Sequence, residues 1–517
     1  MPSRFARLLI LVVLLTLAGT ASARQVEKKK DRRFDDKTIA EWVTELGSAE
    51  ANTRRAAAFA LAKAGPAASP AVKSLVAAID DKDETVRFYA IQAIGRIGAP
   101  AKSAIPVLVK VIRSEGGQLS RVSANALGRM GKDAVEPLAK LLADEEPRLR
   151  GLAATGLAAL GTDARAAGPA LARALADDSF RVRRAVAEAI ALTQPPPKDV
   201  LDALVKTLEN DTDPDVCAAA SKALGRMGKP AVPAIIKALG SDKADVRYHA
   251  IVAALEMRAE AAPAIRALVG CLKDSDTEVR SIAASALARL GEPAVQPLAE
   301  ALSAKDADTR RFAALGLGQI GTAAKTAVKP LLKALEDEDI QVRVAAAGAL
   351  GLIGDAVAVK PLSALLTDKD VEVRRAAAQG LGEIGVEAKS AVDALLIVMK
   401  EKTRATREAA AVALLRIGKP AVPALVSVLK EKDEELRILG VIALGMIGKD
   451  AAGAVGAMAA VLKDESSEVR VYAARSLERL GPVAKDAIKP LEAALKDESL
   501  AVRKAARSAL GKIDPPK

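Results

Sequence analysis

Apolar residues recur with a helical period through most of this chain, and residues 339–354 show the pattern most clearly. Val342, Ala346 and Ile353 belong to a set of apolar positions spaced by three and four residues, which places them on one face of a helix. Asp339 precedes this set as the expected N-cap, and Gly354 follows it as the expected left-handed residue after the last turn. The pattern therefore predicts an amphipathic helix with both ends marked.

A second apolar run follows at residues 358–366. Pro361 falls in its first turn, where a missing backbone N–H costs least. Two helices joined by a short turn form a hairpin that cannot bury both apolar faces alone. Copies of the hairpin must therefore stack on one another.

Near-copies of this hairpin recur about every 30 to 34 residues, which is the mark of a repeat solenoid. Aligned on the Arg343 column there are 15 copies, of which 13 carry arginine at this anchor. The anchors are Arg54, Arg87, Ser120, Arg150, Arg183, Cys217, Arg247, Arg280, Arg310, Arg343, Arg374, Arg407, Arg437, Arg470 and Arg503. Small residues three positions later allow helix axes to approach to about 8–10 Å. We therefore predict an all-α fold, a right-handed α-α superhelix (an α-solenoid) of about 15 stacked helical hairpins.

The repeats are expected to span residues 37–514 as one elongated domain, with residues 37–48 as an N-terminal half-repeat cap. Two stretches interrupt the rhythm: residues 115–117 contain two glycines, and residues 193–197 contain three prolines. Because the repeat resumes at once after each of them, they predict local bends and not domain linkers.

Aromatic residues are scarce at 2% of the chain, so the core is expected to consist of Ala, Leu, Val and Ile. Trp42 lies in the half-repeat cap. Together with Phe59, Phe88 and Tyr89 it is expected to enlarge an otherwise alanine-rich end core.

The N-terminus has the three parts of an export signal. Arg4 and Arg7 form a positive region, residues 8–17 an apolar region, and Ala21-Ser22-Ala23 an A-x-A cleavage site. We predict cleavage after Ala23 and a periplasmic or secreted mature protein, the alternative being an uncleaved anchor. No later segment has the pattern of a membrane span, so no transmembrane segment is expected in the mature chain.

Residues 24–36 are rich in both charges and are expected to be a flexible lead-in, and residues 515–517 a short tail. Removal of the two signal arginines lowers the formal net charge from +12 to +10. Cys217 and Cys271 occupy different repeat positions, which implies a Cα separation beyond the roughly 7 Å that a disulfide allows. We therefore expect no disulfide bond between Cys217 and Cys271.

The repeat columns resemble the HEAT-like repeats of the phycobilisome-lyase type, with the pattern D-x-x-V-R-x-x-A-x-x-A-L-G-x-I-G followed by A-V-x-P-L-x-x-x-L. The resemblance implies that the Asp and Arg columns are structural and tie neighbouring hairpins together. Acids six positions before the anchor fit this use: Asp81, Asp144, Asp177, Asp211, Asp274, Asp337, Asp368, Glu401, Glu431, Asp464 and Asp497. A guanidinium group can bond such carboxylates and turn carbonyls together.

Proteins with similar repeats include chromophore lyases and deoxyhypusine hydroxylase, so the resemblance also implies an enzyme as an alternative. The hydroxylase pattern holds iron with several His-Glu pairs, whereas this chain has one histidine, His249, followed by Ala250. No phosphate loop, nucleophile elbow or Cys/His cluster with metal spacing is present. We therefore predict a non-catalytic protein without cofactor or metal. A catalytic or ligand-handling relative of the lyase and hydroxylase group stays as the alternative.

One exposed column of the second helices predicts a binding surface. Ten positions before the next anchor stand Lys110, Lys140, Arg173, Thr207 (with Lys206 beside it) and Lys237. Such a row, placed on the concave face, suits an extended acidic protein partner. The alternative interpretation is an ordinary solvated helix face.

A second row of lysines, Lys400, Lys430, Lys463 and Lys496, lies at helix C-termini and is interpreted as structural. Attachment to an anionic polymer or membrane surface is a third possible function for so basic a chain. Specific nucleic-acid binding is not expected, because the acids are interspersed and aromatic side chains for base stacking are few. The best interpretation is an exported scaffold for protein–protein interaction in the cell envelope.

Overall fold

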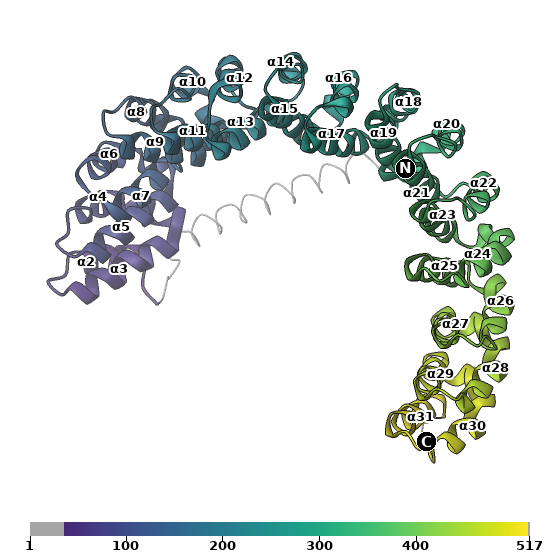
Figure 1. Ribbon diagram of the computed structural model, residues 1–517. Helices are drawn as coiled ribbons and strands as arrows, with labels where there is room; N and C mark the ends of the chain where they lie inside the picture. The colour runs from purple at the N-terminus through teal and green to yellow at the C-terminus, as the bar shows by residue number, and fades with distance from the viewer. Residues whose placement is uncertain (1–35, 515–517) are drawn as a thin grey trace, which may run out of the picture. The chain divides into compact units, whose positions relative to one another are not determined.

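The computed structural model describes residues 36–514. The predicted signal at residues 1–23, nearly all of the lead-in at 24–36 and the tail at 515–517 lie outside the described residues. The chain divides into two compact units, Met1–Met257 and Arg258–Lys517, and each is described by itself. Within residues 36–514 both units are built from helices, with no β-strand (Figure 1).

The first unit alternates longer first helices with shorter second helices. Its first helices are α3 (Ala51–Ala64), α5 (Glu84–Ile97), α7 (Gly117–Leu127), α9 (Pro147–Leu160), α11 (Phe180–Leu192), α13 (Pro214–Met227) and α15 (Ala244–Met257). Its second helices are α2 (Ile39–Leu46), α4 (Val72–Ala78), α6 (Ile105–Ser114), α8 (Val135–Leu141), α10 (Gly168–Ala174), α12 (Leu201–Asn210) and α14 (Val232–Ala238). Short 3₁₀ helices join them: η1 (Gly65–Ala71), η2 (Ala99–Ala104), η3 (Gly131–Ala134), η4 (Gly161–Ala167), η5 (Lys198–Val200) and η6 (Lys229–Ala231).

The second unit continues the same alternation. Its first helices are α17 (Thr277–Leu290), α19 (Ala307–Ile320), α21 (Ile340–Ile353), α23 (Val371–Ile384), α25 (Arg404–Ile417), α27 (Glu434–Ile447), α29 (Ser467–Leu480) and α31 (Leu500–Ile513). Its second helices are α16 (Ile265–Gly270), α18 (Glu292–Ala301), α20 (Val328–Ala334), α22 (Val359–Leu365), α24 (Val392–Met399), α26 (Val422–Val428), α28 (Val455–Ala460) and α30 (Ile488–Ala494). The 3₁₀ helices are η7 (Arg258–Ala264), η8 (Cys271–Lys273), η9 (Gly321–Ala327), η10 (Ala356–Ala358), η11 (Gly385–Ala391), η12 (Lys419–Ala421), η13 (Gly448–Ala454), η14 (Val461–Lys463) and η15 (Gly481–Ala487).

The helix predicted from residues 339–354 forms as α21. The Asp339 side chain accepts the N–H groups of Gln341 and Val342, at 2.8 and 3.1 Å. At the other end Gly354 is left-handed, with φ 73° and ψ 24°, and its N–H donates to the carbonyl of Leu350. Each of the 15 sequence copies supplies a first helix of this kind, which confirms the all-α solenoid of stacked hairpins.

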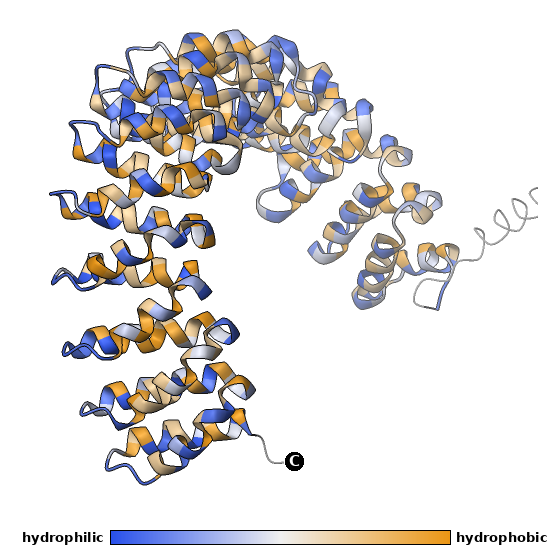
Figure 2. Ribbon diagram, turned by 90° about the vertical axis from the view of Figure 1, so that its right-hand side faces the viewer, coloured by the Kyte–Doolittle hydropathy of each residue, from blue (hydrophilic) through white to orange (hydrophobic). Residues whose placement is uncertain are grey.

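Close contact between successive first helices depends on small residues. A Cβ added to Gly351 of α21 would lie 2.5 Å from the Cα of Gly380 in α23, which no side chain tolerates. Most copies carry glycine or alanine at this column, eight positions after the anchor, so the first helices lie side by side at close range. Figure 2 shows the outcome in both units, with hydrophobic positions between packed helices and hydrophilic positions along the loop edges.

An arginine ladder ties each hairpin to the next. Nη1 of Arg310 in α19 donates to the carbonyl oxygens of Ala304 and Lys305, both at 2.9 Å, in the loop before its own helix. Its Nε and Nη2 donate to the carboxylate of Asp337 at 2.7 and 2.8 Å, in the loop before the next first helix. That carboxylate also accepts the N–H of Asp339 at 2.9 Å. One side chain therefore fastens two successive loops.

The ladder repeats along both units, which confirms the structural role expected for the Arg and Asp columns. The other pairs are Arg54–Asp81, Arg150–Asp177, Arg183–Asp211, Arg343–Asp368, Arg374–Glu401, Arg437–Asp464 and Arg470–Asp497. The expectation is wrong for two acids, because Asp144 pairs with Arg113 and Glu431 pairs with Lys400, each at 2.6 Å. For Asp144 the reason is local: the preceding anchor is Ser120, which has no guanidinium to offer.

Where the anchor is Cys217, the partner acid is missing as well. The next anchor is Arg247, and the residue six positions before it is Ser241 instead of an acid. The Cys217 thiol instead lies 3.6 Å from the carbonyl oxygen of Asp211 in its own loop. Both members of one ladder pair are thus replaced together, which avoids an uncompensated buried charge.

Helix α2 occupies the stretch that was predicted to be a half-repeat cap, and one of the aromatic residues expected in its core is exposed. Thr38 and Glu41 make a capping box at the start of α2, and Trp42 is buried. Phe59, in contrast, is 41% exposed, and its ring meets that of Tyr89 edge-on at 5.1 Å. The expectation that Phe59 enlarges the end core is therefore wrong, because its column faces outward on α3.

Residues Glu434–Lys463 meet the length and hydropathy criteria of a membrane-crossing helix, with a mean hydropathy of 1.6 over the tested window. In the structure this stretch is divided into α27, η13, α28 and η14, and the chain turns at Gly448, where φ is 71°. Helices packed in a core meet the same criteria, and 44% of the window is buried here. The sequence therefore reflects repeat packing at this point, and the absence of a transmembrane segment stays a prediction.

Candidate partner-binding surface

Five basic side chains follow five successive second helices of the first unit. They are Lys110 on α6, Lys140 on α8, Arg173 on α10, Lys206 on α12 and Lys237 on α14. All five are exposed. We call these five residues the basic stripe. It is the surface that the column of cations predicts.

Two details of that prediction are wrong. Thr207, which the alignment placed in the column, is buried, and its hydroxyl donates to the carbonyl of Ala203 at 2.9 Å. The repeat that ends at Cys217 is 34 residues long, so counting back from this anchor misses the exposed position by one, and Lys206 holds it.

The stripe also does not lie on a concave face. In the first unit the second helices lie on the outer side of the arc of first helices (Figure 1). The reason is that the small residues of the first helices let them pack closely, whereas the second helices are spread further apart.

Part of the stripe has a structural explanation. Lys140, Arg173 and Lys237 lie in the last turns of their helices, where a cation complements the helix dipole. Lys140 also forms an ion pair with Glu136, one turn earlier, at 2.8 Å. Lys110 and Lys206 lie earlier in longer helices, so the dipole gives no comparable reason for them.

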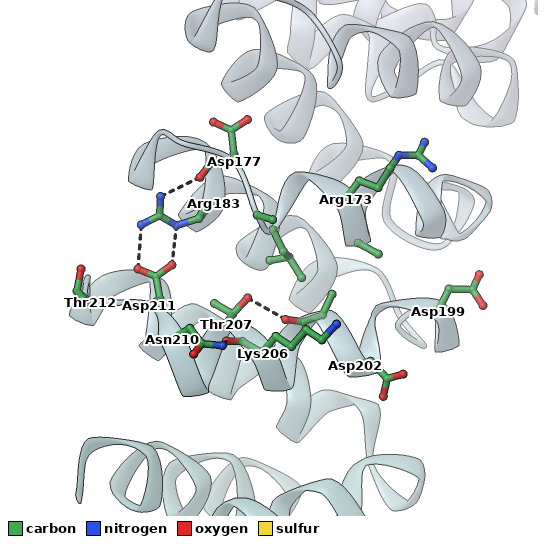
Figure 3. A pocket seen from close by; sticks show the side chains of 14 residues that line it. Arg173, Asp177, Arg183, Asp199, Asp202, Lys206, Thr207, Asn210, Asp211 and Thr212 are labelled. Carbon is green, nitrogen blue, oxygen red and sulfur yellow. Dashed lines mark hydrogen bonds and ion pairs between the residues drawn. The ribbon is translucent and has the colours of Figure 1, made fainter. Parts of the chain in front are cut away.

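A groove of about 730 Å³ lies beside the stripe, between α10 and α12. Arg173 and Lys206 line it from the two helices, and Asp199 and Asp202 lie at one end (Figure 3). The usual glycine turn is replaced here by the prolines of residues 195–197, followed by η5. After this break η5 packs against α10. The prolines predicted a local bend at this point of the chain, but the sequence did not predict the groove.

The inner wall of the groove is neutralised by the ladder. Arg183 donates through Nε and Nη2 to the carboxylate of Asp211 at 2.5 and 2.9 Å. Burial alone would raise the pKa of Asp211, but the hydrogen bonds from Arg183 outweigh it, and the pKa is lowered below its ordinary value. Both groups are therefore charged and paired at neutral pH. The charges left for a ligand are the cations of the stripe and the two aspartates at the end of the groove.

One pair of side chains with catalytic potential, Ser221 and His249, lies close together in the part of the chain that the structure describes. Ser221 Oγ lies 3.3 Å from Nδ1 of His249, a spacing that a nucleophile and its base could have. Ser221, however, is fully buried and donates to the carbonyl of Cys217 at 2.8 Å. Burial lowers the pKa of His249. The arrangement therefore holds a half-buried neutral imidazole against a buried serine hydroxyl of the neighbouring helix.

Cysteine and metal chemistry add no site within the part of the chain that the structure describes. Cys217 and Cys271 are both buried and not joined to each other. Burial raises the pKa of the Cys217 thiol to about 11. Between residues 36 and 514 no group of three His, Cys, Asp or Glu side chains is arranged to hold a metal ion.

Stacked two-helix repeats place this chain in the class of α-solenoid repeat proteins. The family model described as HEAT repeats matches residues 39–121, 105–191, 168–256, 201–273, 265–328, 328–416 and 455–517. The chain therefore belongs to the HEAT-repeat family. No curated protein matches the sequence.

Solved structures with a similar fold include three of Kap121p. The crystal structure of Kap121p gives a TM-score of 0.53 at 16% identity, covering 89% of this chain and 59% of that one. The karyopherin Kap121p bound to the SUMO protease Ulp1p gives 0.56 at 15%, covering 89% and 58%. Kap121p bound to the extreme C-terminus of the protein phosphatase Cdc14p gives 0.54 at 14%, covering 96% and 60%. The chain thus spans about three-fifths of the length of Kap121p, and at these identities the likeness shows the fold alone.

Proposed function

We propose that this chain is a non-catalytic HEAT-repeat scaffold that binds an extended acidic segment of a partner protein along the basic stripe. The observation that carries the proposal is the row of five exposed cations on five successive helices, beside a groove of about 730 Å³. The fold supports this use, since the similar Kap121p has been crystallised bound to Ulp1p and to Cdc14p. The proposal includes the assignment of these repeats to the phycobilisome-lyase type, although we do not propose that this chain has lyase activity.

The spacing of the stripe favours an extended partner. Neighbouring helices lie at least about 8–10 Å apart, whereas an extended chain advances by about 3.3 Å per residue. One cation is therefore offered to roughly every third residue of a segment that crosses the second helices. A partner with acids at this interval would meet each cation in turn.

Ion pairs alone do not suffice for this interaction. An exposed ion pair contributes at most about 1 kcal/mol, whereas a micromolar complex requires about 8 kcal/mol. The groove between α10 and α12 must therefore bury part of the partner. Asp199 and Asp202 at its end favour a basic or neutral residue at that point of the segment.

Charge reversal tests the proposal. The probes are a labelled peptide with glutamate at every third position and the same peptide with glutamine in its place, followed by fluorescence anisotropy over a salt series. The triple variant Lys110→Glu, Arg173→Glu, Lys237→Glu is expected to weaken binding of the glutamate peptide at least tenfold.

The matched control reverses three lysines of the second row, Lys430, Lys463 and Lys496, which changes the net charge equally on the other unit. It should leave the affinity within about twofold. Equal loss in both variants would mean that only net charge matters, and no loss in either would refute the stripe.

We further propose that the scaffold acts outside the cytoplasm, because residues 1–23 carry the pattern of an export signal. N-terminal sequencing of the protein from cell-envelope extracts checks this. The mature chain is expected to begin at Arg24. An intact Met1 in a soluble cytosolic fraction would contradict the proposed location and leave the binding proposal untouched.

A further inference from the structure

A second hollow lies on the first helices of the first unit, on elements other than those of the basic stripe. It measures about 300 Å³ and is lined by Gln92, Gly95 and Arg96 of α5, Val122, Asn125 and Ala126 of α7, and Arg129 beyond the end of α7. Gln92 and Asn125 occupy equivalent columns of successive repeats, as do Arg96 and Arg129. The same pair of groups, an amide and a guanidinium, is therefore presented twice.

The hollow is deep because the backbones of α5 and α7 approach each other closely at its floor. A Cβ added to Gly95 would lie 2.9 Å from the Cα of Ala126. With no side chain larger than the methyl group of Ala126 on the floor, the longer side chains of Gln92, Arg96 and Asn125 form its rim. A ligand chain can thus reach close to the helices between two amides and two guanidinium groups.

The guanidinium groups are available to an anion. Arg96 and Arg129 are exposed, and among residues 36–514 no ion pair is formed by either of them. Arg96 keeps one hydrogen bond, from Nη1 to the carbonyl of Ala62 at 3.2 Å. Arg121 of α7 adds one more exposed cation to the same helix face. The hollow is therefore flanked by two guanidinium groups that form no ion pair among the described residues.

We infer that this hollow binds an acidic side chain of an extended peptide, whose backbone lies across Gln92 and Asn125. A guanidinium group matches a carboxylate with two parallel hydrogen bonds. A side-chain amide both donates and accepts, as a peptide group does, so two amides in register suit an extended backbone. The segment that precedes α2 is not the occupant, because residues 24–35 contain six basic and three acidic residues and are repelled by the same charge.

The surroundings favour peptide over single-stranded nucleic acid. Base stacking requires an open aromatic face. Phe59 is exposed and occupies the same repeat column as Gln92 and Asn125. Its ring meets that of Tyr89 edge-on at 5.1 Å, and the Lys63 ammonium group lies over its face at 5.4 Å. The floor of the hollow is glycine and alanine, which offer no stacking surface.

The test uses the full-length mature chain and a labelled nine-residue peptide with a central Asp-Glu pair, amidated at its C-terminus. The same peptide with Asn-Gln at the centre and a labelled deoxythymidine oligomer are the comparison probes. The double variant Arg96→Glu, Arg129→Glu is expected to weaken binding of the acidic peptide at least tenfold. Arg96→Lys, Arg129→Lys keeps the charge but loses the guanidinium fork, and should weaken it about threefold to tenfold.

Arg289→Glu on α17 is the matched control, because it occupies the same exposed repeat column in the other unit. It should leave this affinity unchanged. The stripe variant of Lys110, Arg173 and Lys237 is measured with the same peptide, and a loss as large as that of Arg96→Glu, Arg129→Glu would assign the binding to the stripe and overturn the inference. Far-UV circular dichroism confirms that each variant is folded. Equal binding of the Asn-Gln peptide, or binding of the oligomer alone, would overturn the inference.

Discussion

Replacing Arg310 by alanine tests how strongly the ladder joins neighbouring repeats. The Arg310 and Asp337 side chains are only 10% and 11% exposed, and the guanidinium group makes four hydrogen bonds, two to the carboxylate and two to loop carbonyls. The substitution leaves the carboxylate without its partner in a poorly hydrated place. We expect α19 and α21 to separate more easily at this edge.

The magnitude follows from those bonds. Breaking a fully buried ion pair costs about 3–5 kcal/mol, and this pair retains some solvent, which reduces the figure. The two carbonyls can be rehydrated once the side chain is gone, and they contribute about 1 kcal/mol together. We therefore expect Arg310→Ala to lower the local free energy of unfolding by about 3 kcal/mol. Arg310→Lys keeps the charge without the fork and should cost about half of that.

Arg503→Ala serves as the control, because Arg503 donates to the carbonyls of Asp497 and Glu498 in its own loop but forms no ion pair with another repeat among residues 36–514. Its loss should cost about 1 kcal/mol. Hydrogen exchange of the Asp339 amide, which donates to Asp337, reports the local free energy directly, and urea unfolding reports the global one. If Arg310→Ala costs no more than Arg503→Ala, the cross-repeat pair does not stabilise the stack and the reasoning is wrong.

Three further predictions concern titration and the replaced ladder pair. Hydrogen bonds from arginine lower the pKa of Asp81 and of Asp497. The stability that these carboxylates provide is therefore complete above the ordinary aspartate pKa of about 3.9 and is lost as the pH falls through the lower folded pKa. Acid titration followed by circular dichroism should show this loss of stability, and an unfolding transition above pH 5 would contradict the prediction. Cys217, buried and with a pKa of about 11, should resist iodoacetamide at pH 8 until urea unfolds the chain, and rapid labelling of the native protein would contradict the packing. Cys217→Arg alone should destabilise the protein, and adding Ser241→Asp should recover stability with a coupling of about 1–3 kcal/mol; additive effects of the two substitutions in a double-mutant cycle would show that no ladder pair forms.

Features that repeat were predictable from the sequence, because the same residue types recur at the same position of most copies. The N-cap at Asp339, the turn at Gly354 and the pairing of Arg310 with Asp337 all follow from patterns that recur along the chain. The first-helix and second-helix alternation follows for the same reason. The handedness of the superhelix stays a prediction.

Features that occur once were predicted less well. Thr207 was misplaced because one repeat is 34 residues long, and column counting cannot tell on which side of a helix the extra residue falls. Phe59 was grouped with Trp42 in the end core, although its column faces solvent. The groove at α10 and α12 depends on how the prolines at 195–197 redirect the backbone, which no spacing of apolar residues encodes.

The most direct test of the scaffold proposal is photo-cross-linking in the cells that make the protein. A benzophenone amino acid replaces Ile236, an exposed residue beside Lys237 of the stripe, and in a second strain Ile397, which is 69% exposed on α24 of the other unit. A discrete adduct is expected from position 236 and not from 397. The cross-linked partner segment should be acidic, and the adduct should disappear when Lys110, Arg173 and Lys237 are reversed in charge. No adduct at 236, or one that persists after charge reversal, would contradict the proposal that the stripe is a protein-binding surface.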